Sequence, residues 1–240
     1  MFYSIISVVI KILVTPLVWP KLRGKENIPA TGPAILVGNH LGVGEPLLLV
    51  GYFPHHLTFP VKEGFFRTDT LWHRLVGWFM RAIHQVPMDR AGGTAASSAL
   101  GSMAEVLEAG GFVAVFPEGH RSPDGRLYRG HTGVARLALG ADAPIVPVAA
   151  FRTRFARGWL PFPWLYRPEL RYGVPFRLDE DLRRAYLEAP DREAAGQALR
   201  QATDQIMGQI QALTGQETVD AYSYIPASKR ATPPAAVESG

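Results

Sequence analysis

Short, largely apolar runs alternate along this chain with longer segments in which apolar residues recur at helical spacing. The short runs are bounded by glycine, proline or polar residues and have the length of buried strands. They fall at residues 34–37, 57–61, 112–116 and 145–150, with a late strand expected at 169–176. The longer segments predict helices at 46–50, 71–80, 94–109, 133–139 and 192–213. This alternation predicts an α/β fold with a mixed, largely parallel sheet flanked by helices.

The first eighteen residues are apolar except for Lys11, two serines and one threonine. A signal peptide would need a basic start and a small-residue cleavage site, and neither is present. A spanning helix needs about 20 apolar residues, whereas here Lys11 falls in mid-segment and Pro16 near its end. The remaining interpretation is a helix that lies in the plane of the membrane surface.

We therefore expect residues 1–20 to form a hydrophobic, membrane-associating helix, with the in-plane and the spanning forms both open. Trp19 would lie at the headgroup level, and the cations Lys21, Arg23 and Lys25 would face an anionic membrane surface. This basic flank favours a catalytic domain on the cytoplasmic face of the cell membrane.

Length and composition narrow the remaining choices. A chain of 240 residues suits one main domain, which we place at residues 21–226, and the tail at 227–240 lacks periodicity and is predicted to be disordered. The absence of cysteine excludes disulfides, thiolate metal sites and a cysteine nucleophile. The net charge of +4 suits anionic lipid or phosphorylated ligands, but the cations are scattered rather than gathered in a stripe, so we expect no nucleic-acid partner.

Polar side chains follow two of the predicted strands. His40 and Glu45 lie on the glycine-rich turn after the first strand, and Glu118, Gly119 and Arg121 follow the strand at 112–116. If Pro46 opens the next helix, Glu45 is its N-cap, a position at which glutamate is unfavourable, so a functional role is favoured. Strand ends of α/β folds commonly carry the chemistry, and a histidine held by a carboxylate is a general base.

These residues belong to two motifs, Asn39-His40 followed by Glu45, and Phe116-Pro117-Glu118-Gly119-His120-Arg121-Ser122. Together they resemble the glycerolipid acyltransferase family, which includes bacterial lysophosphatidate acyltransferases. Two further blocks, 85–90 and 145–148, resemble that family's second and fourth motifs in the same order, and the resemblance runs from about Leu22 to about Phe176.

The resemblance implies transfer of a fatty acyl group from acyl-CoA or acyl carrier protein to the hydroxyl of a lysophospholipid, foremost 1-acyl-glycerol-3-phosphate, in phospholipid biosynthesis. It implies no cofactor apart from the acyl donor, and a membrane lipid as acceptor. Alternatives are a catalytically impaired lipid-binding protein and an acyltransferase with another acceptor, such as a glycolipid.

Roles for the site residues follow from the chemistry and from the resemblance. His40 is the expected base, oriented by Glu45, and direct attack by the substrate needs no enzyme nucleophile. The resemblance assigns Glu118 to the acceptor hydroxyl, with Gly119 beside it, and Arg121 to the phosphate. Lys62 and Arg90 are further phosphate candidates. Backbone amides of the glycine turns at Gly38 or Gly119 are candidates to stabilise the oxyanion.

The chain departs from the family pattern at three positions. The family usually has aspartate where Glu45 stands, threonine at His120 and lysine at His131, the last two in the region implied to bind the acceptor. The extra histidines raise the possibility of a metal site formed with His40, Glu45 and Glu118. However, none of these pairs has a recognised zinc spacing, so we expect no metal.

Overall fold

The computed structural model describes residues 2–88, 94–153 and 167–223. A six-stranded sheet forms the centre, in the order β1 (Lys21–Arg23), β9 (Glu169–Tyr172), β8 (Ile145–Phe151), β2 (Ala34–Gly38), β6 (Phe112–Val115) and β3 (Leu57–Thr58). Strands β8, β2, β6 and β3 run parallel, whereas β9 pairs antiparallel with β8. The predicted mixed, largely parallel sheet is therefore confirmed.

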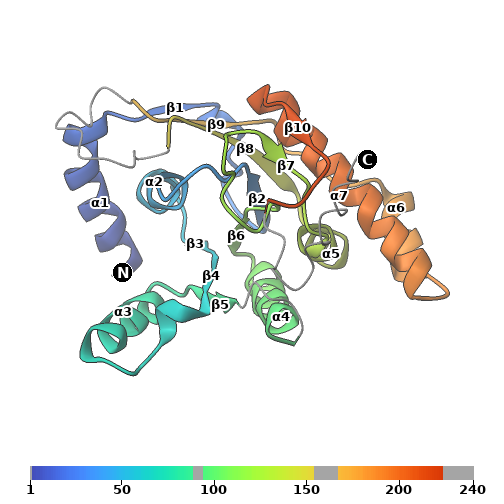
Figure 1. Ribbon diagram of the computed structural model, residues 1–240, viewed down its shortest axis with the longest axis horizontal. Helices are drawn as coiled ribbons and strands as arrows, with labels where there is room; N and C mark the ends of the chain where they lie inside the picture. Colours follow the sequence, from blue (N-terminus) through green and yellow to red (C-terminus); the bar gives the residue numbers. More distant parts are fainter. Residues whose placement is uncertain (1, 89–93, 154–166, 224–240) are drawn as a thin grey trace, which may run out of the picture.

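Helices cover both faces of this sheet (Figure 1). Helices α1 (Phe2–Val18) and α2 (Gly44–Tyr52) lie on one side, whereas α4 (Thr94–Glu108), α5 (Gly133–Ala141) and α7 (Arg192–Thr214) cover the other. Helix α6 (Glu180–Leu187) precedes α7. Successive β2 residues alternate between the two cores: Ile35 and Val37 face one, and Leu36 faces the other. Burial on both faces explains why the parallel strands are continuous apolar runs.

The expected strand at 57–61 is in fact two strands in different sheets. β3 ends at Thr58, and β4 (Pro60–Lys62) pairs instead with β5 (Val86–Met88). Between them the backbone amide of Phe59 donates to the side chain of Gln85 at 2.8 Å, so the chain leaves the central sheet without an unpaired buried amide.

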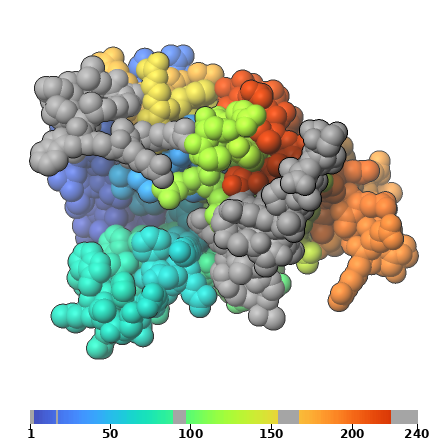
Figure 2. Space-filling view, viewed as in Figure 1, coloured from blue at the N-terminus to red at the C-terminus, as the bar shows by residue number. Residues whose placement is uncertain are grey.

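β4 and β5 lead into a projecting segment made of the 3-10 helix η2 (Glu63–Phe66) and helix α3 (Leu71–Ala82). Figure 2 shows this segment protruding at the lower left, away from the body of the molecule. Thr70 caps α3 by accepting from the amide of His73 at 3.1 Å. The helix predicted here exists, but much of its apolar surface is exposed: Leu71, Trp72, Leu75 and Trp78.

The amino-terminal helix is also present, as the 17-residue α1. It packs against α2, with the hydroxyl of Ser7 donating to the carbonyl of Gly51 at 2.8 Å. Within the described ranges, no helix is both long and apolar enough to cross a bilayer. The predicted disordered tail at 227–240 and the candidate phosphate ligand Arg90 lie outside those ranges.

Candidate active site

The turn after β2 is fixed to the neighbouring strand β8 by Asn39. Its side-chain oxygen accepts from the amide of Ala150 at 2.8 Å, and its amide nitrogen donates to the carbonyl of Ala150 at 3.1 Å. The same nitrogen donates to Gln216 at 2.9 Å. This side chain continues the β2–β8 pairing by one residue and anchors the backbone next to His40. The motif includes Asn39, but the sequence did not predict that it anchors this turn.

His40 and Glu45 lie together at the end of β2. Nδ1 of His40 is 3.4 Å from Oε2 of Glu45, and both side chains are buried. The imidazole ring stacks on Phe116, with ring centroids 4.4 Å apart and the planes inclined by 16°. Nδ1 makes no hydrogen bond within the described residues, but a proton on it would face Glu45 and leave Nε2 with the lone pair that a general base requires.

Glu45 sits in the first turn of α2, which begins at Gly44, so its prediction as the N-cap is wrong. Its Oε1 accepts from the amides of Leu41 at 3.0 Å and Gly42 at 2.9 Å, and also from the hydroxyl of Thr153. Burial alone would raise the pKa of Glu45, but the nearby imidazole of His40 and the hydrogen bond from Thr153 outweigh it and hold the pKa below its ordinary value. Glu45 is therefore a buried, ionised partner for His40.

Glu118 binds the backbone of both neighbouring segments. Its Oε1 accepts from the amide of His40 at 2.9 Å, and its Oε2 accepts from the amide of Tyr128 at 3.0 Å. Burial raises the pKa of Glu118 to about 7, against the effect of these two amides, and the negative charge of Glu45 adds to the rise. In this structure the Glu118 carboxylate holds the His40 turn against β7 (Leu127–Tyr128).

The turn that carries Arg121 is fastened to His40 as well, because the amide of Ser122 donates to the carbonyl of His40 at 2.7 Å. Both backbone polar groups of His40 are thus bonded to the segment 118–122. Arg121 is exposed, as is Lys62 at the end of β4. Within the described part of the chain neither cation is paired with a carboxylate, which leaves both able to meet an anion.

Gly119 and His131 are brought into contact. Gly119 has a φ of 71°, and a Cβ placed on it would lie 2.9 Å from Cδ2 of His131. Its amide donates to the carbonyl of Phe116 at 3.0 Å, so in this conformation Gly119, one of the two candidates for oxyanion donor, is not available for that role. Only a glycine fits this turn without strain and without displacing the imidazole.

A carboxy-terminal strand closes this side of the site. β10 (Thr218–Val219) pairs parallel with β7, and Figure 2 shows the two segments side by side. Tyr222, just beyond β10, stacks on His131 with ring centroids 4.5 Å apart. Burial, and then the charge of Arg200, lower the pKa of His131, so its imidazole is neutral at pH 7. No local pattern in the sequence indicates this packing of Tyr222.

Among the described residues, no group of three or more histidine, aspartate or glutamate side chains is arranged to hold a metal ion. His120 lies between Gly119 and Arg121 and is partly buried. The chemistry that the arrangement supports is proton transfer at His40 Nε2, with the exposed cation Arg121 on the turn that is bonded to His40.

Comparison with known proteins matches residues 20–150 to the family described as Acyltransferase. The chain is 28% identical over 146 residues to a 1-acyl-sn-glycerol-3-phosphate acyltransferase of Pseudomonas aeruginosa, covering 60% of this chain and 54% of that protein. It is 30% identical over 131 residues to the protein of that name from Bacillus subtilis, covering 54% and 61%. The alignments thus span little more than half of these relatives.

The fold has a counterpart among solved structures. The crystal structure of the 1-acyl-sn-glycerophosphate (LPA) acyltransferase PlsC from Thermotoga maritima matches with a TM-score of 0.57 and 22% identity. The match covers 85% of this chain and 79% of that one. It supports the architecture described above.

Proposed function

This chain belongs to the acyltransferase family, and we propose that it transfers a fatty acyl group from a thioester to the hydroxyl of a lysophospholipid. The donor is acyl-CoA or acyl carrier protein, and 1-acyl-glycerol-3-phosphate is the foremost acceptor, in keeping with the names of its relatives. The observation that carries the proposal is the buried His40–Glu45 pair at the end of β2, with the turn of Arg121 fastened to the same backbone.

In the proposed reaction Nε2 of His40 removes the proton of the acceptor hydroxyl as its oxygen attacks the thioester carbonyl. Glu45 stabilises the imidazolium that forms. The C–O bond forms, the C–S bond breaks, and the imidazolium returns its proton to the leaving thiolate, so the products are the ester and a free thiol. No covalent intermediate with the enzyme is needed.

The acceptor phosphate binds Arg121 in this proposal, because a guanidinium suits a phosphate and this one is exposed beside the His40 turn. Lys62 and Arg90 are proposed to add positive charge. Glu118 acts by holding the His40 turn through its two amide bonds, and its contact with the acceptor hydroxyl stays a prediction.

The experiment is thiol release from acyl-CoA with and without a panel of lysophospholipid and glycolipid acceptors. His40→Ala should lower kcat at least about a hundredfold, the lower range for loss of a general base. Asp181→Asn, at a side chain on α6 that is 95% exposed, is the control and should keep wild-type turnover. Near-normal turnover in folded His40→Ala would reject the mechanism. A wild-type protein that binds lysolipid but releases no thiol would favour the non-enzymatic alternative.

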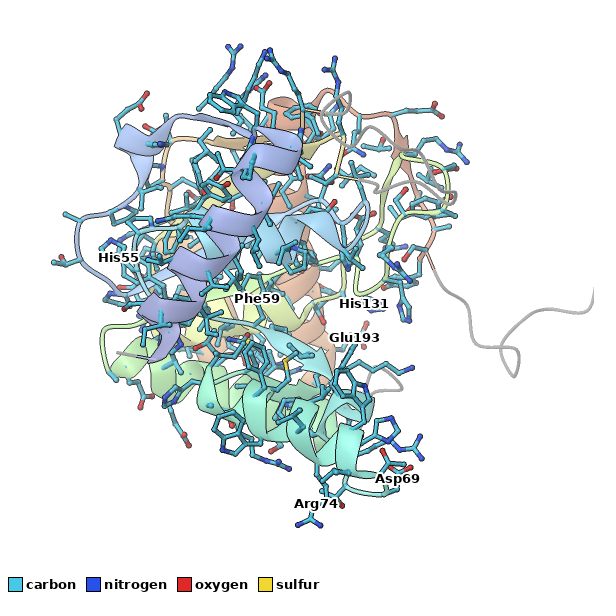
Figure 3. The ribbon with its side chains drawn as sticks, turned by 90° about the vertical axis from the view of Figure 1, so that its left-hand side faces the viewer. His55, Phe59, Asp69, Arg74, His131 and Glu193 are labelled. Carbon is cyan, nitrogen blue, oxygen red and sulfur yellow. The ribbon has the colours of Figure 1, made fainter. Side chains whose placement is uncertain are left out.

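We also propose that α1 and α3 place the protein on an anionic membrane surface. Both helices lie on the side that faces the viewer in Figure 3, where the labelled Arg74 projects from α3. Leu71 is 83% exposed and Trp72 is 68% exposed, and large exposed apolar groups near cations are typical of interfacial helices. The corresponding residues of α1 are Ile5, Val8, Val9, Ile12 and Leu13.

Flotation with liposomes tests this membrane proposal. Removal of residues 1–18 should weaken flotation, but because α1 packs on α2, point variants are the cleaner test. Ile12→Ser with Leu13→Ser, and separately Leu71→Ser with Trp72→Ser, change exposed side chains only. Each pair should reduce flotation with anionic liposomes while leaving the melting temperature unchanged. Flotation equal to wild type in both pairs would place the membrane contact elsewhere.

A further inference from the structure

The hydroxyl of Thr153 reaches Glu45 from a different part of the fold. Thr153 follows β8 and is 108 residues from Glu45 in the sequence, yet it is fully buried and donates to Oε1 of that carboxylate. The chain is turned toward Glu45 by Arg152, which has a φ of 56°. A non-glycine residue rarely adopts that conformation, so the end of β8 is shaped in an unusual way where Thr153 enters the site.

We propose that Thr153 is a positioning residue, whose hydroxyl fixes the rotation of the Glu45 carboxylate so that Oε2 faces His40. The expected effect on turnover rests on the proposed acyl transfer, whereas the contact of Thr153 with Glu45 does not depend on it.

The donors around Glu45 show why Thr153 decides this rotation. The amide of Gly42 lies within hydrogen-bonding distance of both oxygens, at 2.9 Å from Oε1 and 3.0 Å from Oε2. It therefore does not distinguish one oxygen from the other. The amide of Leu41, at 3.0 Å from Oε1, belongs to the same turn as His40 and moves with it. Of the described donors to Glu45, Thr153 is the one that lies outside the turn of His40, just after β8.

The need for such an anchor follows from the identity of the residue. The terminal torsion of a glutamate side chain is broad, and glutamate has one more rotatable bond than aspartate. Rotation of the carboxylate about this bond moves Oε2 away from Nδ1 of His40, which is already 3.4 Å distant. A donor fixed just after β8 limits that rotation and, unlike the amides of Leu41 and Gly42, does not move with the His40 turn.

A purely structural role for Thr153 makes a different prediction. A buried hydroxyl could take the nearest acceptor merely to avoid being unpaired, and its loss would then change stability without changing the chemical step. The two roles are separated by comparing kcat with KM, by rescue with serine, and by coupling to Glu45.

The test uses the full chain with Thr153→Val, which keeps the shape and removes the hydroxyl, and Thr153→Ser, which keeps the hydroxyl. We expect Thr153→Val to lower kcat about tenfold, with both KM values within about twofold of wild type, and Thr153→Ser to stay within about threefold in kcat. In a Glu45→Gln background, Thr153→Val should add less than about a twofold loss, because the two residues act through one carboxylate. If Thr153→Val does not fold, Thr153→Ala replaces it in the same cycle.

A second measurement does not depend on turnover. Proton–nitrogen correlation spectra of the imidazoles should show His40 as a single tautomer with its proton on Nδ1 in the wild type and in Thr153→Ser, and as a mixture of tautomers in Thr153→Val. An unchanged His40 signal in folded Thr153→Val would overturn the inference, as would an equal tenfold loss in both backgrounds. A wild type that transfers no acyl group to any acceptor would instead overturn the proposed function, and the spectra would still decide the role of Thr153.

Discussion

Glu118 makes the stability of this protein depend on pH in a direction opposite to that of most carboxylates. Burial raises its pKa from the ordinary 4.5 to about 7, so the folded protein binds this proton more tightly than the unfolded chain does. The contribution to stability is therefore complete below about pH 4.5 and is lost as the pH rises to about 7. The substitution Glu118→Gln removes the titration, since it leaves a neutral side chain of the same shape.

The size of the effect follows from the pKa. A rise from 4.5 to about 7 corresponds to about 3 kcal/mol, at roughly 1.4 kcal/mol for each pKa unit. The amides of His40 and Tyr128 favour the anion, and their effect is already contained in this pKa. Glu118→Gln also turns an amino group toward one of these donors, which costs about 1–3 kcal/mol at every pH. The difference in unfolding free energy between wild type and Glu118→Gln thus has a constant part and a pH-dependent part, which a pH series separates.

The assay is urea unfolding of wild type and Glu118→Gln, followed by circular dichroism at several values between about pH 4.5 and pH 8. The unfolding free energy of the wild type, relative to the variant, should fall by up to about 3 kcal/mol across this range and level off above about pH 7. Glu217→Gln, at a side chain that is 74% exposed, is the control and should give a flat difference. A difference between wild type and Glu118→Gln that is constant, or that rises with pH, would refute the reasoning.

Three further predictions concern the same site. Glu45→Gln should lower kcat by roughly a hundredfold or more, because the charge that stabilises imidazolium is lost. Glu45→Asp keeps the charge, so its kcat should fall less. Equal turnover in the Glu45→Gln variant and the wild type would make the role of Glu45 structural. The acceptor KM of the wild type should rise as the pH increases toward 6.5 and stay flat above it, since the lowered pKa leaves His131 uncharged there. His131→Lys restores a fixed charge and should reduce KM at pH 7.5 by about fivefold, the equivalent of about 1 kcal/mol. Superimposable KM profiles of the wild type and His131→Lys would remove His131 from the phosphate site. Gly119→Ala should lower the unfolding free energy by about 1–2 kcal/mol, because alanine is strained at a positive φ and its Cβ meets His131. A melting temperature equal to that of wild type would show that the turn accepts alanine without loss of stability.

The central strands and the contact between His40 and Glu45 were predictable from local pattern. A parallel strand covered by helices on both faces has to be apolar at successive positions, so β2, β6 and β8 stand out as short apolar runs. His40 and Glu45 are only five positions apart on one turn, and so short a segment keeps their side chains close together. The family motifs then added a chemical meaning to that spacing.

Other features depend on residues that only folding brings together. The bonds from Asn39 to Ala150, from Thr153 to Glu45 and from Glu118 to His40 join residues 111, 108 and 78 positions apart, and no local period records such pairs. The same holds for the stacking of Tyr222 on His131 and for the division of the segment 57–61 between two sheets. A buried polar group needs a hydrogen-bond partner. It bonds to the segment that packs next to it in the fold, and that segment can be distant in the sequence. The proposed catalytic pair, His40 and Glu45, can therefore be found in the sequence, whereas the groups around it are determined by the packing of β8, β7 and the carboxy-terminal strand.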